Sequence, residues 1–173
     1  MTDSSSDLRL GVLGTGRIGT MHVDLVHHRV AGMEVAAVFD VHQPSVEQVA
    51  ATVGARVAAS PKDLIMGDDV DAVAICSSTD THIDLLVAAA AAGKPVFIEK
   101  PLSLDLAEVD RGIAAARAAG IPVQVGFNRR FDASHQAVRD AVAGGEIGDV
   151  QMVRITSRDP APPPLSYIAV SGG

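Results

Sequence analysis

The sequence predicts an α/β protein built on a doubly wound parallel sheet. Apolar runs bounded by turn residues alternate with longer segments of helical period along most of the 173 residues. A glycine-rich turn directly follows the first apolar run, and an acidic residue, Asp40, ends the second. Because parallel strands need crossover helices, this order indicates a sheet that is covered by helices on both faces.

The predicted elements alternate from Leu8 onward. The predicted strands are the runs LRLGVL, EVAAVF, ARVA, DAVAIC, PVFI and PVQVGF. The predicted helices begin near Arg17 and Pro44 and then cover residues 81–92, 105–119 and 133–143. This is the order βαβαβ written nearly twice, within about 120 residues, which is enough for one core.

Short polar side chains and glycines support the helix boundaries. Ser60, Thr81 and Asp105 each precede a helical segment and are followed three residues later by an acidic residue, so all three are predicted N-caps. Gly93 and Gly120 follow helices at the position where a left-handed residue commonly ends them.

The turn after the first strand predicts a dinucleotide site. Gly14, Gly16 and Gly19 have G-x-G-x-x-G spacing between a strand and a helix. The first glycine permits a tight turn, the second lets the backbone approach a pyrophosphate, and the third allows close packing of helix on strand. The phosphates would lie at the helix N-terminus, where backbone N–H groups point outward. The sequence therefore predicts a Rossmann domain, with Ile18 in the binding turn.

Asp40 predicts the choice of cofactor. It lies 21 residues after Gly19, at the end of the second strand, where a carboxylate accepts hydrogen bonds from an adenosine ribose and repels a 2′-phosphate. No arginine follows it, so NAD is expected rather than NADP. Arg17 is a candidate phosphate contact, with a solvated first-turn arginine as the alternative.

The stretch CSSTDTH follows the fourth strand, where sheets of this kind bind ligands across the switch in strand order. Ser77, Ser78 and Thr79 are therefore candidates to line the dinucleotide. The alternative is that these side chains only cap the next helix.

Composition argues against several classes of partner. A formal charge of −7 disfavours nucleic acid and anionic membranes. The start, MTDSSSD, lacks the apolar core of a signal peptide, and the apolar run LLVAAAAA is far shorter than the ~20 residues of a membrane helix. A cytoplasmic protein with a disordered segment 1–7 is expected.

No metal site is expected either. Cys76 is the single cysteine, and His22, His27 and His28 share a helix without the spacing of a zinc pair. Cys76 is interpreted as a packed thiol near a strand end.

The character of the chain changes after residue 126. Residues 149–157 alternate in polarity, with Val153 and Ile155 on one face and Arg154 and Thr156 on the other, which predicts the first strand of a second sheet. A proline-rich tail follows. The expected domains are therefore 8–126, the dinucleotide-binding domain, and 127–173, the start of a second and truncated α+β domain.

Glu99, Lys100 and Pro101 form an unexpected charged turn after a buried strand, FIEKPLS. Together with GVLGTGRIGTMH, THIDLL, GFNRRFD and SRDPAPPPLSYIAVSGG, this EKP turn resembles the Gfo/Idh/MocA family of NAD(P)-dependent oxidoreductases, and within it the inositol 2-dehydrogenases. The resemblance covers essentially the whole chain. The dinucleotide motif is shared by many dehydrogenases, whereas EKP combined with the SRDPAPPP tail is much more specific.

The resemblance implies roles for particular residues. Lys100 would lie beside the nicotinamide and take part in proton transfer or binding at the reacting hydroxyl, with a cis bond to Pro101. Glu99, Pro101 and His82 would belong to the cofactor site, with Glu99 touching the cofactor or orienting Lys100. Asn128 and Arg129 would face nicotinamide and substrate. By itself, a Glu-Lys-Pro turn is more often a surface ion pair.

Members of this family are about twice as long as this chain. Their second domain covers the cofactor, holds the substrate and forms the oligomer interface, and it carries an aspartate and a histidine that complete the catalytic set. Three hypotheses follow. The chain is half of a polyol dehydrogenase, oligomeric when full length or completed by a second chain; or a non-catalytic NAD-binding module; or an unrelated Rossmann enzyme such as a methyltransferase.

Overall fold

A computed structural model describes residues 7–158 and 161–162. The chain divides into two compact units between Gly126 and Phe127. Nearly all of the N-terminal segment 1–7 and most of the proline-rich tail lie outside the described residues. The assignment of the second unit to a substrate domain stays a prediction.

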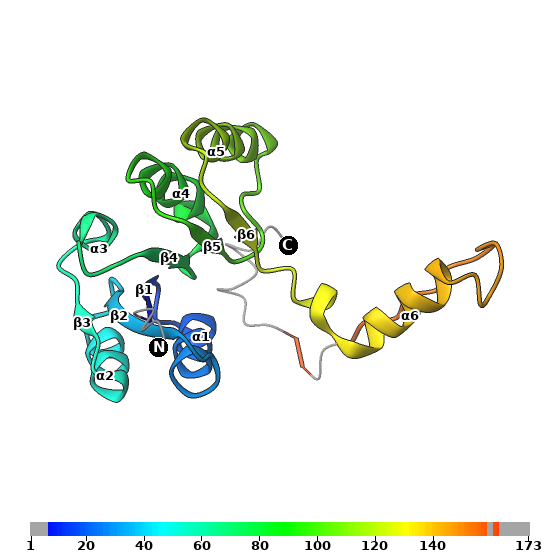
Figure 1. Cartoon of the computed structure of the whole chain (residues 1–173), viewed down its shortest axis with the longest axis horizontal. Helices are drawn as coiled ribbons and strands as arrows, with labels where there is room; N and C mark the ends of the chain where they lie inside the picture. The colour runs from blue at the N-terminus through cyan, green and yellow to red at the C-terminus, as the bar shows by residue number, and fades with distance from the viewer. Residues whose placement is uncertain (1–6, 159–160, 163–173) are drawn as a thin grey trace, which may run out of the picture. The chain divides into compact units, whose positions relative to one another are not determined.

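The first unit alternates strands and helices as the sequence predicts (Figure 1). Its strands are β1 (Leu8–Leu13), β2 (Met33–Phe39), β3 (Arg56–Val57), β4 (Ala72–Ile75), β5 (Val96–Ile98) and β6 (Val123–Val125). Its helices are α1 (Arg17–Arg29), α2 (Gln43–Val53), α3 (Pro61–Met66), the 3-10 turn η1 (Thr79–Thr81), α4 (His82–Ala91) and α5 (Leu106–Ala119).

All strand pairs in this sheet are parallel, in the order β3-β2-β1-β4-β5-β6. The order reverses between β1 and β4, which lie side by side although β2 and β3 separate them in the sequence. The predicted doubly wound fold is thereby confirmed. Ligands of such sheets bind outside the carboxyl ends of the strands at this switch point.

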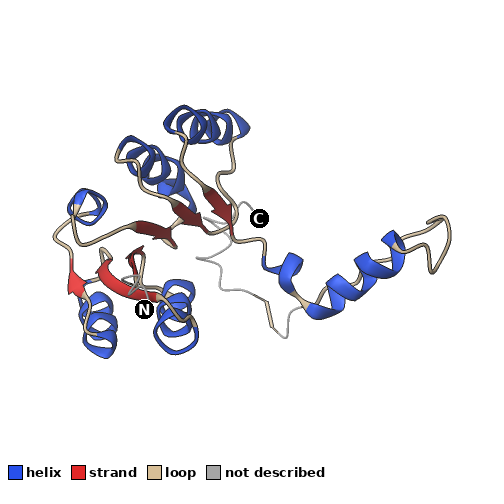
Figure 2. Cartoon of the chain, viewed as in Figure 1, coloured by secondary structure: helices blue, strands red, loops and turns tan. Residues whose placement is uncertain are grey.

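Helices cover the sheet on both faces (Figure 2). On one face, buried side chains of α1 and α2, including Val23 and Val46, pack against β1 and β2. On the other face, Leu64 of α3 and Leu86 of α4 pack against β4 and β5. Short strands that are apolar on both faces, such as AVAI in β4, are buried along their whole length for this reason.

Two of the three predicted N-caps are confirmed. The Ser60 hydroxyl accepts from the Asp63 amide at 3.0 Å, and the Asp105 carboxylate accepts from the Ala107 amide at 2.8 Å. Thr81 lies directly before α4 as predicted, but its side chain forms no capping hydrogen bond to the helix, because η1 precedes α4 and turns the hydroxyl back onto the Ser78 carbonyl at 2.8 Å.

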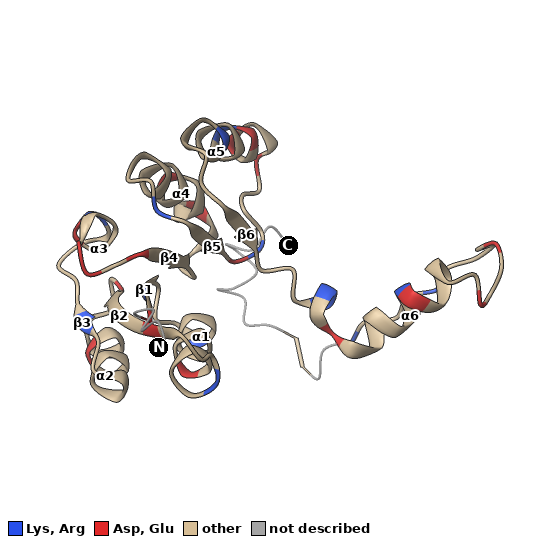
Figure 3. Cartoon of the chain, viewed as in Figure 1, with Lys and Arg blue, Asp and Glu red and all other residues tan. Residues whose placement is uncertain are grey.

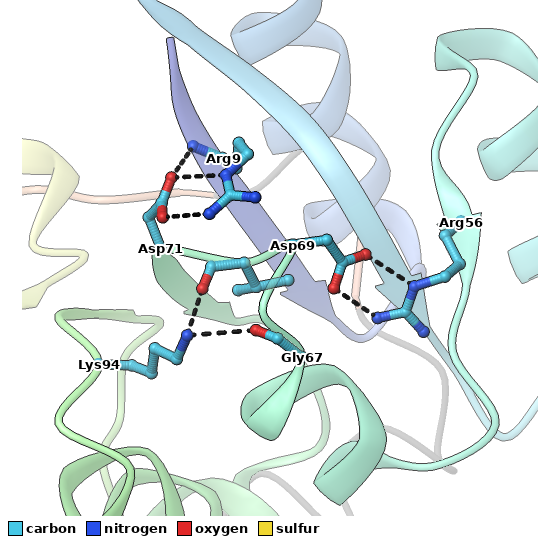
Figure 4. Close-up of polar contacts among 7 residues, drawn as sticks. Arg9, Arg56, Gly67, Asp69, Asp71 and Lys94 are labelled. Atoms are coloured by element: carbon cyan, nitrogen blue, oxygen red, sulfur yellow. Dashed lines mark hydrogen bonds and ion pairs between the residues drawn. The ribbon is translucent and has the colours of Figure 1, made fainter. Parts of the chain in front are cut away.

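Hydrogen bonds and ion pairs link the segments at the amino ends of the strands, the end of the sheet opposite the switch point (Figure 4). Arg9 at the start of β1 forms two side-chain hydrogen bonds to Asp71, just before β4, and these lower the pKa of Asp71 to about 2. The Lys94 ammonium, just before β5, donates to the backbone carbonyls of Gly67 and Val70. Arg56 binds Asp69 through two further hydrogen bonds, of 2.7 and 3.0 Å.

The second unit contains the 3-10 helix η2 (Asn128–Phe131) and α6 (Ala133–Ala143). Residues 149–157, predicted as a strand, have no regular secondary structure. A strand needs a neighbour to pair its backbone N–H and C=O groups, and the described residues of this unit include no other strand. The strand predicted from the polarity alternation is therefore not formed in the described structure. In the described residues, no helix is long and apolar enough to cross a membrane.

Candidate functional site: the carboxyl ends of β1, β4 and β5

The three glycines of the turn after β1 do different things. Gly14 has a φ of +95°, and a Cβ there would lie 2.6 Å from the Ser77 amide nitrogen. A Cβ at Gly19 would lie 1.9 Å from the Gly14 carbonyl oxygen, whereas one at Gly16 would meet nothing within 4 Å. The first and third glycines therefore bring β1, α1 and the chain after β4 into close contact, and Gly16 leaves open space at the start of α1.

The start of α1 is suited to an anion. Gly16 is its N-cap and supplies no side chain to bond the first-turn amides, and no acidic residue lies in the first turn. Arg17 is exposed and Ile18 is half-buried in that turn. The uncapped amides, the positive end of the helix and the open space at Gly16 fit a pyrophosphate. That Arg17 and Ile18 contact the cofactor stays a prediction.

Asp40, directly after β2, is held against the glycine turn. Its Oδ2 accepts from the Thr15 amide at 2.6 Å and from the Thr15 hydroxyl at 3.2 Å, and its Oδ1 accepts from the His42 amide at 2.9 Å. The Ser45 hydroxyl donates to the Thr15 carbonyl at 2.8 Å. Buried Thr15, which the sequence motif did not single out, thus fixes Asp40 beside the glycine turn.

The loop after β4 lies next to the same turn, because Gly14 packs on the Cys76–Ser77 backbone. The hydroxyls of Ser77 and Thr81 lie 2.7 Å apart, which links the two ends of this loop. Ser78 is exposed and Thr79 is half-buried at the start of η1. The loop lies at the switch point as expected. Dinucleotide contact by Ser77, Ser78 and Thr79 stays a prediction.

The EKP turn directly follows β5, at the same edge of the sheet. The Glu99 amide donates to the Ile75 carbonyl at 2.9 Å, and the Lys100–Pro101 peptide bond is cis, as the resemblance implied. Glu99 Oε2 accepts from the Lys100 amide at 3.3 Å. The Lys100 side chain is exposed, and among the described residues its ammonium forms no ion pair. Within residues 7–158 and 161–162, the surface ion pair that a Glu-Lys-Pro turn suggests by itself is therefore not present.

Two histidines contact this turn from either side. His22 of α1 lies with its Nε2 2.8 Å from Glu99 Oε1, and its ring packs edge-on against Phe97 with centroids 4.9 Å apart. His82, at the start of α4 and only 1% exposed, has Nδ1 2.8 Å from the Pro101 carbonyl and Nε2 3.1 Å from the Ser77 carbonyl.

Sequence reasoning placed His82 in the cofactor site and gave His22 no role except to exclude a metal. In the structure, both bind the EKP turn through contacts between residues 77 and 19 positions apart in the chain. The sequence feature that could have identified His22 is its place on the face of α1 that also carries buried Val23 and Val26.

Cys76 lies between the glycine turn and Glu99. Burial, and secondly the Glu99 charge, raise the pKa of its thiol to about 12. A thiol in this state is a poor nucleophile, which agrees with the expected packing role. Among the described residues, no three His, Cys, Asp or Glu side chains are arranged to hold a metal ion.

Asn128 and Arg129 belong to η2 in the second unit, where both are exposed. Substrate contact by these two residues stays a prediction. Among Lys, Arg, Asp and Glu, both signs of charge occur on α1, α3, α5 and α6, whereas α2 and α4 carry acidic residues only (Figure 3).

Known proteins resemble this chain over nearly all its length. It is 47% identical over 167 residues to the myo-inositol 2-dehydrogenase of Thermotoga maritima and 43% identical over 166 residues to the inositol 2-dehydrogenase of Rhizobium meliloti. Each alignment covers 96% of this chain and 50% of the relative. The chain therefore spans about half the length of these curated relatives.

Solved structures of dehydrogenases are also similar to this chain. The crystal structure of a probable dehydrogenase from Thermotoga maritima superposes with a TM-score of 0.92 at 47% identity, over 96% of this chain and 50% of that one. The scyllo-inositol dehydrogenase of Lactobacillus casei, solved with NAD(H) and scyllo-inositol, gives a TM-score of 0.79 at 30% identity, over 83% and 43%. The profile of an oxidoreductase family with an NAD-binding Rossmann fold matches residues 8–127. The chain therefore belongs to the Gfo/Idh/MocA oxidoreductase family, and residues 8–127 are its NAD-binding Rossmann domain.

Proposed function

We propose that this chain is the cofactor-binding half of an inositol 2-dehydrogenase-like enzyme, which transfers a hydride from a hydroxyl-bearing carbon of a cyclic polyol to NAD. The observation that supports this most directly is the position of Lys100. It follows β5 at the edge of the sheet where the glycine turn and Asp40 also lie, and Glu99 beside it contacts α1, the phosphate-binding helix. Family membership removes the unrelated Rossmann enzyme as an alternative.

Each part of the proposed site has one task. The α1 amides at Gly16 hold the pyrophosphate, and Asp40 accepts from the adenosine ribose and disfavours the 2′-phosphate of NADP. When bound, NAD supplies the hydride acceptor. The carbon loses a hydride and its hydroxyl loses a proton, and Lys100 takes part in binding that hydroxyl or in moving that proton.

The second unit would contribute to substrate binding. Asn128 and Arg129 are proposed to face the substrate, and the rest of the natural protein, or a second chain, would supply a substrate domain and an oligomer interface. A non-catalytic NAD-binding module is the second candidate, favoured by the fact that residues 8–127 alone carry the whole dinucleotide-binding domain. Intact-mass measurement on the natural gene product separates the two: about 17.8 kDa favours the module, and about double that favours the dehydrogenase.

The test measures NADH formation from myo-inositol and related polyols by the natural gene product. Lys100→Ala should lower turnover by about 10²- to 10⁴-fold, the usual loss when acid-base assistance is removed, while NAD affinity changes little. Lys62→Ala, at an exposed lysine on α3, is the matched control and should be unchanged. Unaltered turnover in Lys100→Ala would contradict the proposed role of this lysine.

The residues 1–173 by themselves are expected to bind NAD but to oxidise no polyol at a useful rate. Hydride transfer needs the substrate held in line with the cofactor, and such orientation supplies ~7–11 kcal/mol of barrier reduction. The same assay on this chain alone checks the expectation. Normal turnover would show that no further domain is needed.

A further inference from the structure

The backbone on both sides of Lys100 is held by a histidine. On the amino side, His22 contacts the Glu99 carboxylate, and the other oxygen of that carboxylate accepts from the Lys100 amide. On the carboxyl side, His82 contacts the Pro101 carbonyl. The His22 and Glu99 side chains are only 22% and 18% exposed, and His82 is 1% exposed, so water competes little for these contacts.

We propose that His22 and His82 are positioning residues that fix Lys100 at the reacting hydroxyl; the inference rests on the proposed role of Lys100. Neither histidine needs to touch substrate or cofactor. His22 ties the EKP turn to α1, which carries the phosphate site, and His82 ties it to the loop after β4. The turn therefore has a fixed position relative to both cofactor-binding segments.

The hydrogen-bond partners determine which ring nitrogen matters. A carboxylate and a carbonyl only accept, so each histidine must donate an N–H. For His22 the donor is Nε2, at 2.8 Å from Glu99. For His82, both ring nitrogens face carbonyl oxygens, and the N–H that holds the EKP turn is on Nδ1, 2.8 Å from Pro101, whereas the contact from Nε2 to Ser77 is longer, at 3.1 Å.

Because the two histidines donate from different ring nitrogens, Asn and Gln substitutions should have opposite effects at the two positions. The Asn amide nitrogen occupies roughly the place of His Nδ1, and the longer Gln side chain brings its amide nitrogen close to the place of His Nε2. Thus His22→Gln and His82→Asn preserve the assigned hydrogen bond, while His22→Asn and His82→Gln lose it. Simple loss of packing volume would instead favour Gln, the larger side chain, at both positions.

The experiment measures kcat, KM and calorimetric NAD affinity for these four variants of the natural gene product. Turnover should fall by about 10- to 100-fold in His22→Asn and His82→Gln, in line with the ~10²-fold cost of misplacing a catalytic group by about 1 Å. It should stay within about threefold in the other two, and in His22→Asn and His82→Gln the loss of kcat should exceed any loss of NAD affinity. Variants of exposed His27 on the same helix, to Asn and to Gln, are the controls.

A second measurement does not depend on activity. In the unmodified protein, nitrogen-15 NMR of labelled histidine should show the ring protons on Nε2 of His22 and Nδ1 of His82 exchanging slowly with water. Rapid exchange of both, or equal kcat for Asn and Gln at each position, would overturn the inference. If Lys100→Ala keeps full turnover, the proposed function fails, and the ring protons still decide whether the two contacts exist.

Discussion

Replacing Gly19 by Ala tests how the phosphate turn is built. An alanine Cβ at this position would lie 1.9 Å from the Gly14 carbonyl oxygen and 2.9 Å from its carbon, with the Cys76 Cβ at 3.4 Å. Non-bonded carbons and oxygens need about 3 Å or more, so α1 would have to retreat from the turn by about 1 Å. The obstacle is backbone, which cannot rotate away as a side chain can.

The size of the effect follows from that displacement. Overpacking of a close contact costs about 1–3 kcal/mol of unfolding free energy, and the backbone position of the clash places Gly19→Ala at the upper end. With a urea slope of ~1–3 kcal/mol per molar, the unfolding midpoint should fall by about 1–3 M. Loss of one amide hydrogen bond to a charged phosphate, ~1.5–3 kcal/mol, would also weaken NAD binding about 10- to 100-fold.

Gly16→Ala is the matched control, because a Cβ there has open space on all sides within 4 Å and the φ of −69° suits alanine. Its unfolding free energy should change by less than about 1 kcal/mol. NAD affinity should still fall, because the new methyl group would occupy the space proposed for the pyrophosphate. Urea unfolding and calorimetric titration of both variants supply the measurements. A Gly19→Ala protein with the urea midpoint of the unmodified protein would refute the reasoning.

Three further predictions concern side chains around the sheet. Asp40→Ser should narrow the preference for NAD over NADP in calorimetric titrations and should cost about 1–3 kcal/mol in urea unfolding, because the Thr15 amide loses its acceptor; equal binding of NAD and NADP by the unmodified protein would refute it. Because Arg9 lowers the pKa of Asp71 to about 2 in the folded protein, the Arg9–Asp71 pair should stabilise the fold fully above about pH 4 and lose this effect as the pH falls toward 2. Between about pH 4 and pH 2, the free energy of unfolding should therefore depend less on pH in Asp71→Asn than in the unmodified protein, and an unchanged pH dependence would contradict the Arg9–Asp71 pairing. Cys76, with its thiol pKa raised to about 12, should react with iodoacetamide at pH 8 only after unfolding in urea, as followed by mass spectrometry.

The sequence by itself determined the fold class and the positions of the glycine turn and Asp40 at the ends of β1 and β2. Strand-helix alternation, the spacing of Gly14, Gly16 and Gly19, and the position of Asp40 are local patterns, and the structure places them as the patterns predict. The local signal failed for Thr81, where a preceding 3-10 turn changed the cap, and for residues 149–157, where pairing depends on a neighbouring strand. Local propensity cannot specify a partner.

Only the tertiary structure decided what surrounds Lys100. The strand order brings the ends of β1, β4 and β5 together, and so places His22 of α1 against Glu99 across 77 positions of sequence. The contacts of Thr15 with Asp40 and of His82 with Pro101 arise in the same way. Such contacts depend on distances between side chains from different elements, which periodicity and spacing along the chain do not encode.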